Sequence, residues 1–245
     1  MKTTGNTILI TGGSAGIGFE IARQFVQQGN KVIITGRDAA RLEKAKAELG
    51  NVTAIQFDVT SAADVDALTE RIKAEFPELN ILINNAGRAL IHNLAESRSY
   101  DIAVDEMTTN YFSVLLLTDK LLPLLKEQNE AAVLNVSSVV AYVPTQHLPT
   151  YAASKAALHS YTTSLRLALT GTSVKVFELM PPLVNTELSK EIGGENGIPP
   201  SVVAEDVLDA IAGNRYEIRT GQTEDVYQLS LANPAEALKV MNPVA

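Results

Sequence analysis

The sequence predicts one α/β domain, with a doubly wound parallel sheet of about seven strands and helices on both faces. Short, continuously apolar runs alternate along the 245 residues with amphipathic stretches of helical length. A glycine-rich turn follows the first run, and no shift in composition divides the chain. Runs that are apolar on both faces are typical of strands covered by helices on each side, and their alternation with helices implies right-handed parallel crossovers.

The predicted strands are the apolar runs themselves, because a strand that is buried on both faces needs no polar alternation. They lie at Thr7–Thr11, Lys31–Thr35, Val52–Phe57, Ile81–Asn84, Ala132–Val136 and Val174–Leu179.

The predicted helices lie between these strands, where apolar residues recur at helical intervals. Gly29 and Gly50 stand where C-terminal caps belong. Pro123 predicts a kink or a late start in the fourth helix, because proline lacks the amide hydrogen that a helix interior uses. The predicted ranges are Gly18–Gln28, Ala39–Leu49, Ala62–Phe76, Asp105–Gln128 and Thr150–Leu169.

Composition argues against several classes of function. The net charge of −8 argues against a nucleic-acid or anionic-membrane surface. The chain has no cysteine, and its three histidines lack the spacings of metal ligands, so we expect no metal site. We expect His92 and His147 in loops and His159 on a helix surface. Without a signal-peptide core or a long apolar run, the chain is expected to be a soluble cytoplasmic protein.

A glycine-rich turn, Thr11–Gly18, follows the first strand and has the spacing G-x3-G-x-G at Gly12, Gly16 and Gly18. Glycines let the backbone approach a phosphate closely, and the start of the next helix supplies amide groups and a partial positive charge. Such turns also serve merely to reverse a chain. The strand before this turn and the helix after it favour nucleotide-phosphate binding.

The end of the second strand bears on the choice of cofactor. It reads Thr35-Gly36-Arg37, without a carboxylate where a free ribose 2′-hydroxyl would be bound. A guanidinium at this place can bind a 2′-phosphate through two parallel hydrogen bonds. Alternatively, Arg37 is a solvated residue at a helix start that pairs with Asp38 or Glu43. We expect NADP(H) to be favoured over NAD(H).

Ser138, Tyr151 and Lys155 form the candidate catalytic set. Tyr151 and Lys155 are four residues apart at the start of a predicted helix, so they share a face. An adjacent ammonium is expected to lower the pKa of the tyrosine and make it a usable proton donor. Ser138 ends a predicted strand, where it can bond a substrate oxygen. The alternative for the pair is an aromatic side chain on a helix face beside a lysine that lies over it.

These motifs resemble those of the short-chain dehydrogenase/reductase family. Thr11–Gly18 is similar to its cofactor loop, residues 84–87 (N-N-A-G) to its sheet motif, and residues 151–155 (Y-A-A-S-K) to its catalytic motif. Asn110 matches the asparagine that completes the family's catalytic tetrad. The likeness keeps its order and spacing from about residue 5 to residue 190. It implies a Rossmann fold, an oxidoreductase and a homodimer or homotetramer.

The resemblance also implies roles for single residues. Asn110 would anchor a water that links Lys155 to bulk solvent. Asp58 would accept a hydrogen bond from the adenine amino group, unless it is a helix N-cap. Together, the motifs and the resemblance predict cofactor contacts at Gly12, Ser14, Gly16, Ile17, Gly18, Arg37, Asp58, Val59, Asn85, Ala86, Tyr151, Lys155, Val184 and Thr186.

Two segments extend or depart from the family pattern. Pro181-Pro182 replaces the usual Pro-Gly, so the turn beside the cofactor is expected to differ locally. The Gly- and Pro-rich residues 183–200 are expected to form a mobile loop over the substrate, a plain surface loop being the alternative. Leucines of the long fourth helix would either face the sheet or supply an oligomer face; they are Leu115, Leu116, Leu122 and Leu125.

We therefore expect reversible reduction of a carbonyl substrate to a secondary alcohol by NADPH, with Ser138 positioning the oxygen and Tyr151 giving the proton. Two alternatives stay open. One is an NADP(H)-binding regulator or scaffold without turnover, and the other is dehydratase or epimerase chemistry on the same fold. No residue pattern identifies the substrate.

Overall fold

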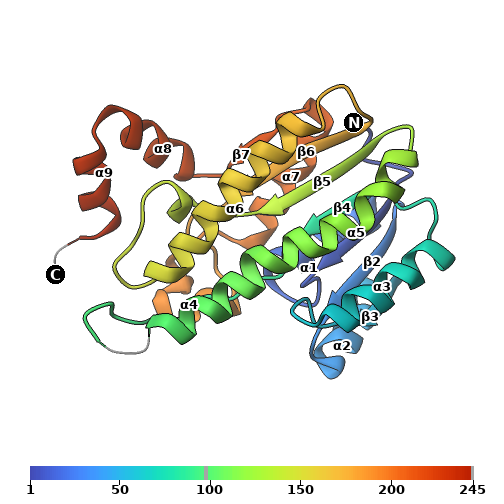
Figure 1. The fold of residues 1–245 in the computed structure, drawn as a ribbon, viewed down its shortest axis with the longest axis horizontal. Helices are drawn as coiled ribbons and strands as arrows, with labels where there is room; N and C mark the ends of the chain where they lie inside the picture. The colour runs from blue at the N-terminus through green and yellow to red at the C-terminus, as the bar shows by residue number, and fades with distance from the viewer. Residues whose placement is uncertain (97–98, 244–245) are drawn as a thin grey trace.

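A seven-stranded parallel sheet forms the centre of the molecule in the computed structural model, which describes residues 1–96 and 99–243 (Figure 1). The strand order is β3-β2-β1-β4-β5-β6-β7, so the winding direction reverses between β1 and β4. Such a reversal opens a crevice at the carboxyl ends of the strands. The strands are β1 Thr7–Thr11, β2 Lys31–Gly36, β3 Val52–Gln56, β4 Ile81–Asn84, β5 Ala131–Val136, β6 Val174–Met180 and β7 Glu217–Arg219.

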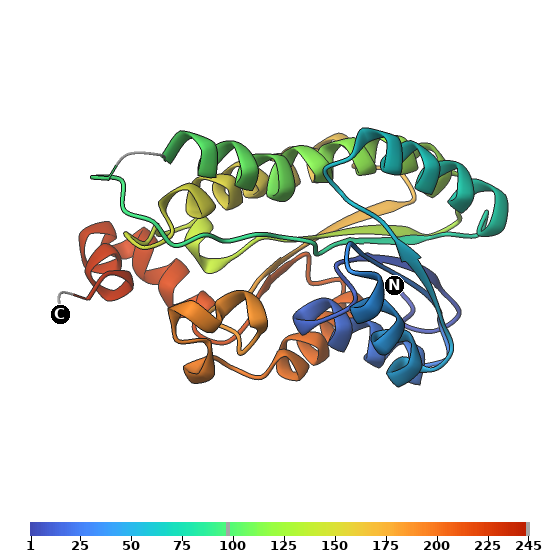
Figure 2. The same ribbon diagram turned by 90° about the horizontal axis from the view of Figure 1, so that it is seen from below.

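Helices cover both faces of this sheet, which Figure 2 shows nearly edge-on. One face packs against α1, α2 and α7, and the other against α3, α5 and α6. The predicted doubly wound architecture is therefore confirmed. The helices are α1 Gly16–Gln27, α2 Ala39–Leu49, α3 Ala62–Glu75, α4 Ser99–Met107, α5 Ser113–Glu127, α6 Pro149–Ala168, α7 Pro200–Gly213, α8 Thr223–Ala232 and α9 Pro234–Met241.

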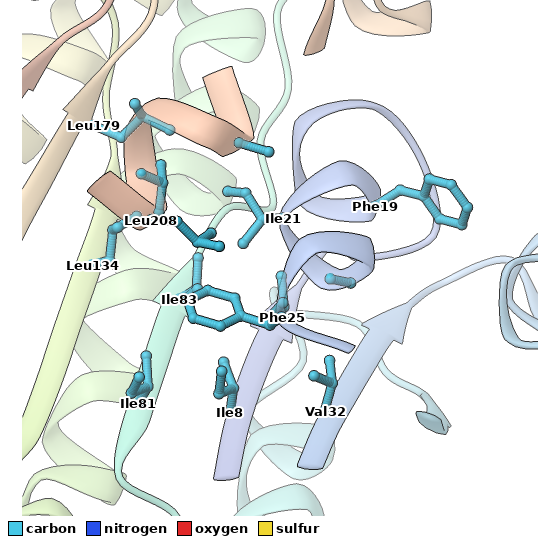
Figure 3. Packing of buried hydrophobic residues seen from close by; sticks show 14 of the residues in the cluster. Ile8, Phe19, Ile21, Phe25, Val32, Ile81, Ile83, Leu134, Leu179 and Leu208 are labelled. Atoms are coloured by element: carbon cyan, nitrogen blue, oxygen red, sulfur yellow. The ribbon is translucent and has the colours of Figure 1, made fainter. Parts of the chain in front are cut away.

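The core on the α1 side holds the first strand–helix–strand unit together (Figure 3). Ile21 and Phe25 of α1 are fully buried in the same cluster as Ile8 of β1 and Ile83 of β4. Each such side chain contributes about 1.5–3 kcal/mol when it is fully buried. This packing fixes the direction in which α1 leaves the glycine-rich turn.

The fourth predicted helix differs from the expectation. Helical structure begins at Ser99, before the predicted start at Asp105, and a π-helical turn at Thr108–Phe112 separates α4 from α5. The predicted late start is wrong, because α5 runs through Pro123. Pro123 lies on the exposed side of α5, while its neighbours Leu121 and Leu124 are buried against the sheet. Their packing outweighs the one hydrogen bond that proline removes.

The leucines of α5 mostly face the sheet. Leu125 is buried in the core beneath α5, and Leu116 and Leu122 pack partly against that core. Within residues 1–96 and 99–243, no helix combines the length and the apolar character that crossing a membrane requires. The C-terminal helices α8 and α9 project beyond the carboxyl ends of the strands (Figure 1).

Candidate active site

Hydrogen bonds between the ends of β1 and β4 hold the glycine-rich turn. The Thr11 hydroxyl accepts from the backbone amides of Asn85 and Ala86, at 3.0 and 3.1 Å. The Asn85 side-chain amide donates back to the carbonyls of Thr11 and Gly12, at 2.9 and 3.1 Å. Asn85 and Ala86 thus border the turn, as expected, and Thr11 is the partner that positions them.

The turn has the shape that a dinucleotide pyrophosphate requires. Gly12 and Gly16 adopt positive φ angles of +66° and +57°. A Cβ at Gly18 would lie 2.4 Å from the Asn85 side-chain nitrogen, so only glycine fits there. Ala15, the N-cap of α1, makes no side-chain capping bond, which leaves the first amides of α1 available for an anion. The residues present therefore fit the group that the motif predicts.

Arg37 and Asp58 lie beside each other at the far end of the crevice. Burial pushes the pKa of Asp58 up, but hydrogen bonds from Thr60 and the charge of Arg37 outweigh it and hold the pKa below its usual value. Asp58 is not the N-cap of α3, because Ser61 takes that position. In the described part of the chain, no carboxylate pairs with the exposed Arg37 guanidinium, and Asp38 instead caps α2.

Ser14 and Val59, two further residues predicted to contact the cofactor, lie where they can border a nucleotide. A Cβ at Gly36 would lie 3.1 Å from Ser14 Oγ, so the glycine turn and the end of β2 approach each other closely. Val59 follows Asp58 and packs partly against the core under α3. Ser14, Gly36 and Arg37 thus share one edge of the crevice.

Ser138, Tyr151 and Lys155 converge where β5 ends. Ser138 and Tyr151 line the same cavity, and the Ser138 hydroxyl is near enough to lower the pKa of the Tyr151 phenol. Lys155 Nζ donates to the carbonyl of Val136 at 2.8 Å and lies 5.5 Å from the centre of the Tyr151 ring. The three predicted catalytic side chains therefore lie close together, just after β5 and on the first turns of α6.

The pKa of Tyr151 differs from the expectation. Burial raises the pKa of Tyr151 to about 12, while the Ser138 hydroxyl lowers it and the charge of Glu106 raises it. The expected net lowering of the Tyr151 pKa is therefore wrong, because burial is the largest influence on it. Lys155 is itself deeply buried, and burial lowers its pKa to about 8 against the opposing charge of Glu178. Tyr151 is a neutral phenol at neutral pH, which is the form that donates a proton.

Asn110 is fully buried in the π-helical turn between α4 and α5. Its side chain accepts from the amide of Arg88 and donates to the carbonyl of Arg88, both at 2.8 Å, and donates to Ser154 Oγ at 2.9 Å. A Cβ at Gly87 would lie 3.4 Å from Asn110 Oδ1 and 3.7 Å from Lys155 Nζ. Asn110 therefore lies close to Lys155 and joins the loop after β4 to α6.

A second buried carboxylate lies behind the site and was missed by the sequence analysis. Glu106 accepts from the amide of Leu90 at 2.8 Å and from the Thr150 hydroxyl at 2.5 Å. Burial raises its pKa, although both hydrogen bonds oppose the shift. Its position one helical turn before Asn110 is the signal that could have indicated it.

A cavity of about 720 Å³ opens above Ser138 and Tyr151. The predicted nicotinamide-side residues Val184 and Thr186 line it, and so do Ile17 and His147. Thr186 also lies against the glycine turn, because a Cβ at Gly16 would be 3.2 Å from Thr186 Cγ2. Most of the remaining wall is apolar, from Ile91, Val139, Val140, Leu148, Leu183, Leu188, Ile192, Met241 and Pro243.

Residues 183–200 form the outer wall of this cavity. They contain two short 3₁₀ helices, Glu187–Ile192 and Gly194–Asn196, and a bridge between Val184 and Ile198. Ser189 Oγ donates to the carbonyl of Val184 at 2.5 Å and closes the turn between them. The segment therefore has internal structure, and its mobility stays a prediction.

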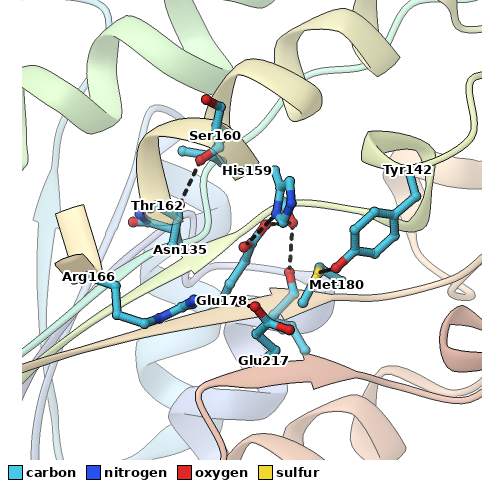
Figure 4. Close-up of polar contacts among 12 residues, drawn as sticks. Asn135, Tyr142, His159, Ser160, Thr162, Arg166, Glu178, Met180 and Glu217 are labelled. Carbon is cyan, nitrogen blue, oxygen red and sulfur yellow. Dashed lines mark hydrogen bonds and ion pairs between the residues drawn. The ribbon is translucent and has the colours of Figure 1, made fainter. Parts of the chain in front are cut away.

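The three histidines occupy different surroundings. His92 and His147 lie in loops, as expected. His159 lies on helix α6, as expected, but it is half-buried, and its Nδ1 lies 2.9 Å from an oxygen of the buried Glu178 (Figure 4). The signals were a charged residue inside the apolar run of β6, and a histidine one turn after Lys155.

Comparison with known proteins points to one family. A family model described as short chain dehydrogenase matches residues 6–197. The chain is 37% identical over 248 residues to the uncharacterized oxidoreductase DltE of Bacillus subtilis, covering 99% of this chain and 98% of that protein. It is 36% identical over 193 residues to the NADP-dependent 3-hydroxy acid dehydrogenase YdfG of Escherichia coli K12, covering 78% of each.

Solved structures show the same fold. A short-chain dehydrogenase/reductase from Burkholderia phymatum in complex with NAD superposes with a TM-score of 0.90 at 23% identity, covering 100% of this chain and 99% of that chain. A short-chain dehydrogenase from Burkholderia cenocepacia in complex with NADP gives a TM-score of 0.87 at 27% identity, covering 98% of each.

Proposed function

Because the chain belongs to the short-chain dehydrogenase family, we propose that it reversibly reduces a carbonyl substrate to a secondary alcohol with NADP(H). The observation that carries the proposal is the convergence of Ser138, Tyr151 and Lys155 beside the open glycine turn. When bound, the cofactor supplies or accepts the hydride. The turn formed by residues 11–18 would hold its pyrophosphate, and Val184 and Thr186 would lie at its nicotinamide end.

The proton step follows from the protonation states of the site. Tyr151 carries its proton at neutral pH and can give it to the oxygen of a carbonyl that is being reduced. The Ser138 hydroxyl shares that oxygen and orients it. Lys155, as an ammonium, stabilises the phenolate that remains. A water held near Asn110 would return a proton to Lys155 from solvent.

The preference for NADP(H) rests on the edge of the crevice at Arg37. The guanidinium is exposed beside Gly36, which has no side chain to repel or replace a 2′-phosphate. The Escherichia coli relative is named NADP-dependent, and one of the two similar structures contains NADP while the other contains NAD. Arg37 supports NADP(H) for this chain.

The cavity favours an uncharged substrate with apolar groups. Among its described lining residues there is no lysine or arginine, and Glu191 places a carboxylate on the rim. A substrate carboxylate would be repelled by Glu191 and would find no cation to bind. We therefore expect this chain to disfavour hydroxy acids, although the Escherichia coli relative is named for them.

An oligomer would use the outer face of α4, α5 and α6. Tyr100, Phe112 and Leu167 are exposed there, with 79%, 54% and 71% of their surfaces accessible. Exposed large apolar side chains are typical of interfaces, and these would contribute to a homodimer or homotetramer face that the sheet-facing leucines of α5 do not supply.

The test is oxidation of NADPH across aldehydes, ketones, quinones and 3-oxoacyl thioesters, with Tyr151→Phe as the inactive control. Ethyl 3-oxobutanoate and 3-oxobutanoate form a matched neutral and anionic pair, and the ester should be the better substrate. Glu191→Gln should reduce the preference for the ester over the acid. Glu187→Gln, on the same segment but outside the cavity wall, should leave that preference unchanged. Binding of NADPH without turnover of any compound would instead support a regulator or scaffold.

A further inference from the structure

Helix α6 presents three functional side chains in one line. Tyr151, Lys155 and His159 follow at four-residue intervals, so they leave the same face of the helix. This face lies over the end of β5, where the chain continues through residues 136–138. The first two side chains belong to the catalytic set, and the third has no role in the proposed mechanism.

The catalytic lysine holds one end of this segment, and the catalytic tyrosine lies beside the other. Lys155 Nζ donates to the carbonyl of Val136 at 2.8 Å. Ser138, two residues further on, accepts from the amide of Val140 at 3.3 Å and lines the same cavity as Tyr151. The residue between them, Ser137, is held in a different way.

Ser137 is linked to the third member of the line through a strand. Its hydroxyl donates to Glu178 Oε1 on β6 at 2.5 Å, and His159 Nδ1 lies 2.9 Å from Glu178 Oε2. Figure 4 shows the Glu178 carboxylate directed at the imidazole. Residues 136 and 137 are therefore held in succession by Lys155 and by Glu178 with His159, and Ser138 follows beside Tyr151 in the cavity wall.

Burying the Glu178 carboxylate costs folding stability, and a role in the site would explain this cost. Its side chain is 0% exposed, and in the described ranges its ion-pair partner is His159, whose side chain is 29% exposed. No lysine or arginine within those ranges pairs with it. Burying a carboxylate is unfavourable compared with burying an apolar residue of similar size. A strand that is otherwise apolar around this position gains nothing in stability from the charge.

We propose that Glu178 and His159 form a positioning pair, which clamps α6 to the end of β5 and keeps a negative charge behind Lys155 so that this lysine remains an ammonium. The inference rests on the proposed carbonyl reduction, in which Lys155 stabilises the Tyr151 phenolate. Glu178 contacts neither Lys155 nor Tyr151 directly. It acts through its charge on Lys155 and through its contact with Ser137.

The electrostatics agree with this geometry. Burial lowers the pKa of Lys155 to about 8, and the charge of Glu178 is the opposing influence. Without the carboxylate, the pKa of Lys155 would fall further and part of the lysine would be neutral near pH 7. The ammonium form, which the proposed reduction requires, would then be partly lost near neutral pH.

His159 connects the pair to the pH of the solvent. Its hydrogen bond to Glu178 raises its pKa and outweighs the effect of burial, with Glu217 on β7 raising it and Arg166 on α6 lowering it. The ring of Tyr142 packs edge-on against the imidazole at 5.1 Å. A protonated His159 offsets the Glu178 charge, and a neutral one leaves that charge to act on Lys155.

The test is Glu178→Gln, which keeps an acceptor for Ser137 and a donor for His159 but removes the charge. The alkaline limb of kcat for NADPH-dependent reduction should move down by about one pH unit or more, with the rate at pH 6 little changed. At pH 8 a shift of one unit from a pKa of about 8 should make the variant about fivefold slower than the wild type. A merely structural role would lower kcat equally at every pH.

Two measurements make the result independent of turnover and of folding. NMR titration of ¹³C-labelled Lys155 should show its pKa lowered in Glu178→Gln, even if no substrate has been found. Glu75→Gln, which removes an exposed carboxylate on α3, is the control and should leave both readouts unchanged. Ser137→Ala keeps the charge of Glu178 but removes the hydrogen bond between Ser137 and Glu178. We therefore expect kcat to fall at all pH values while the pKa of Lys155 stays unchanged.

The two proposals can fail separately. If Glu178→Gln folds and leaves the Lys155 titration unchanged, the charge role is wrong. If Ser137→Ala retains wild-type kcat, the clamp is wrong, and this variant decides the matter should Glu178→Gln not fold. If wild-type protein reduces no carbonyl but Lys155 shifts as expected, the proposed function fails and the charge coupling stands.

Discussion

Arg37 offers the sharpest test of the cofactor assignment. We predict that Arg37→Ala weakens NADPH binding and leaves NADH binding nearly unchanged, because only NADPH carries the 2′-phosphate. A charge-assisted contact of this kind contributes about 1.5–3 kcal/mol, which corresponds to roughly 10- to 150-fold in Kd. Since the guanidinium is exposed and salt screens it, the lower half of that range is expected at physiological ionic strength.

The structure also shows how the preference could be reversed. A Cβ at Gly36 would lie 3.1 Å from Ser14 Oγ, the mobile end of a short side chain, which can turn away. Gly36→Asp would then place a carboxylate where it can accept from a 2′-hydroxyl and repel a 2′-phosphate. The double variant Gly36→Asp with Arg37→Ala should bind NADH more tightly than NADPH.

The assay is the Kd of each reduced cofactor, by fluorescence or calorimetry at two fixed ionic strengths. Arg71→Ala, an exposed arginine on α3, is the matched control and should leave the ratio of the two constants unchanged. If wild-type protein binds NADH as tightly as NADPH, or if Arg37→Ala leaves the ratio unchanged, the reasoning is refuted.

Three further predictions concern the proton donor, the outer wall and the buried acid. Tyr151→Phe should reduce kcat by at least about 100-fold while the Kd of NADPH stays within about twofold; a variant that keeps half its rate would rule out Tyr151 as the acid. Residues 183–200 should exchange amide hydrogens faster in the free protein than with NADPH and substrate bound, and equal rates would contradict a mobile loop. The raised pKa of Glu106 means that its ionisation destabilises the folded chain, so stability is fullest at acid pH and declines as pH rises through the folded pKa. Urea unfolding between pH 5 and pH 7.5 should show a smaller decline for Glu106→Gln than for wild type, and equal declines would contradict this account.

Much of the fold could be predicted because its signals are local. The six predicted strands match β1 to β6 within one residue at each end, since a run of apolar residues identifies a strand buried on both faces. The seventh strand, Glu217–Arg219, has charged residues at both ends and three residues in all, too few for a pattern. It is a strand because β6 lies beside it and supplies its hydrogen-bond partners.

The candidate site divides in the same way. The glycine turn and the pair Tyr151–Lys155 could be identified from spacing, because each motif lies within one short stretch of chain. Glu178 and Glu106 were missed: an apolar run around Glu178 and the spacing of Glu106 from Asn110 are local signals, but they do not show which groups each carboxylate bonds. Their partners Ser137, His159 and Thr150 come from other elements.

The sequence by itself determined the doubly wound sheet, the glycine turn and the spacing of the catalytic side chains, because periodicity and short-range spacing act between residues that are neighbours in the chain. Only the tertiary structure decided that α5 continues through Pro123, that the pKa of Tyr151 rises, and that His159 reaches a buried carboxylate. Each of these depends on how much water is excluded and which distant groups come into contact. Desolvation and long-range contact arise when the sheet and its helices pack together, so no local pattern in the sequence carries them.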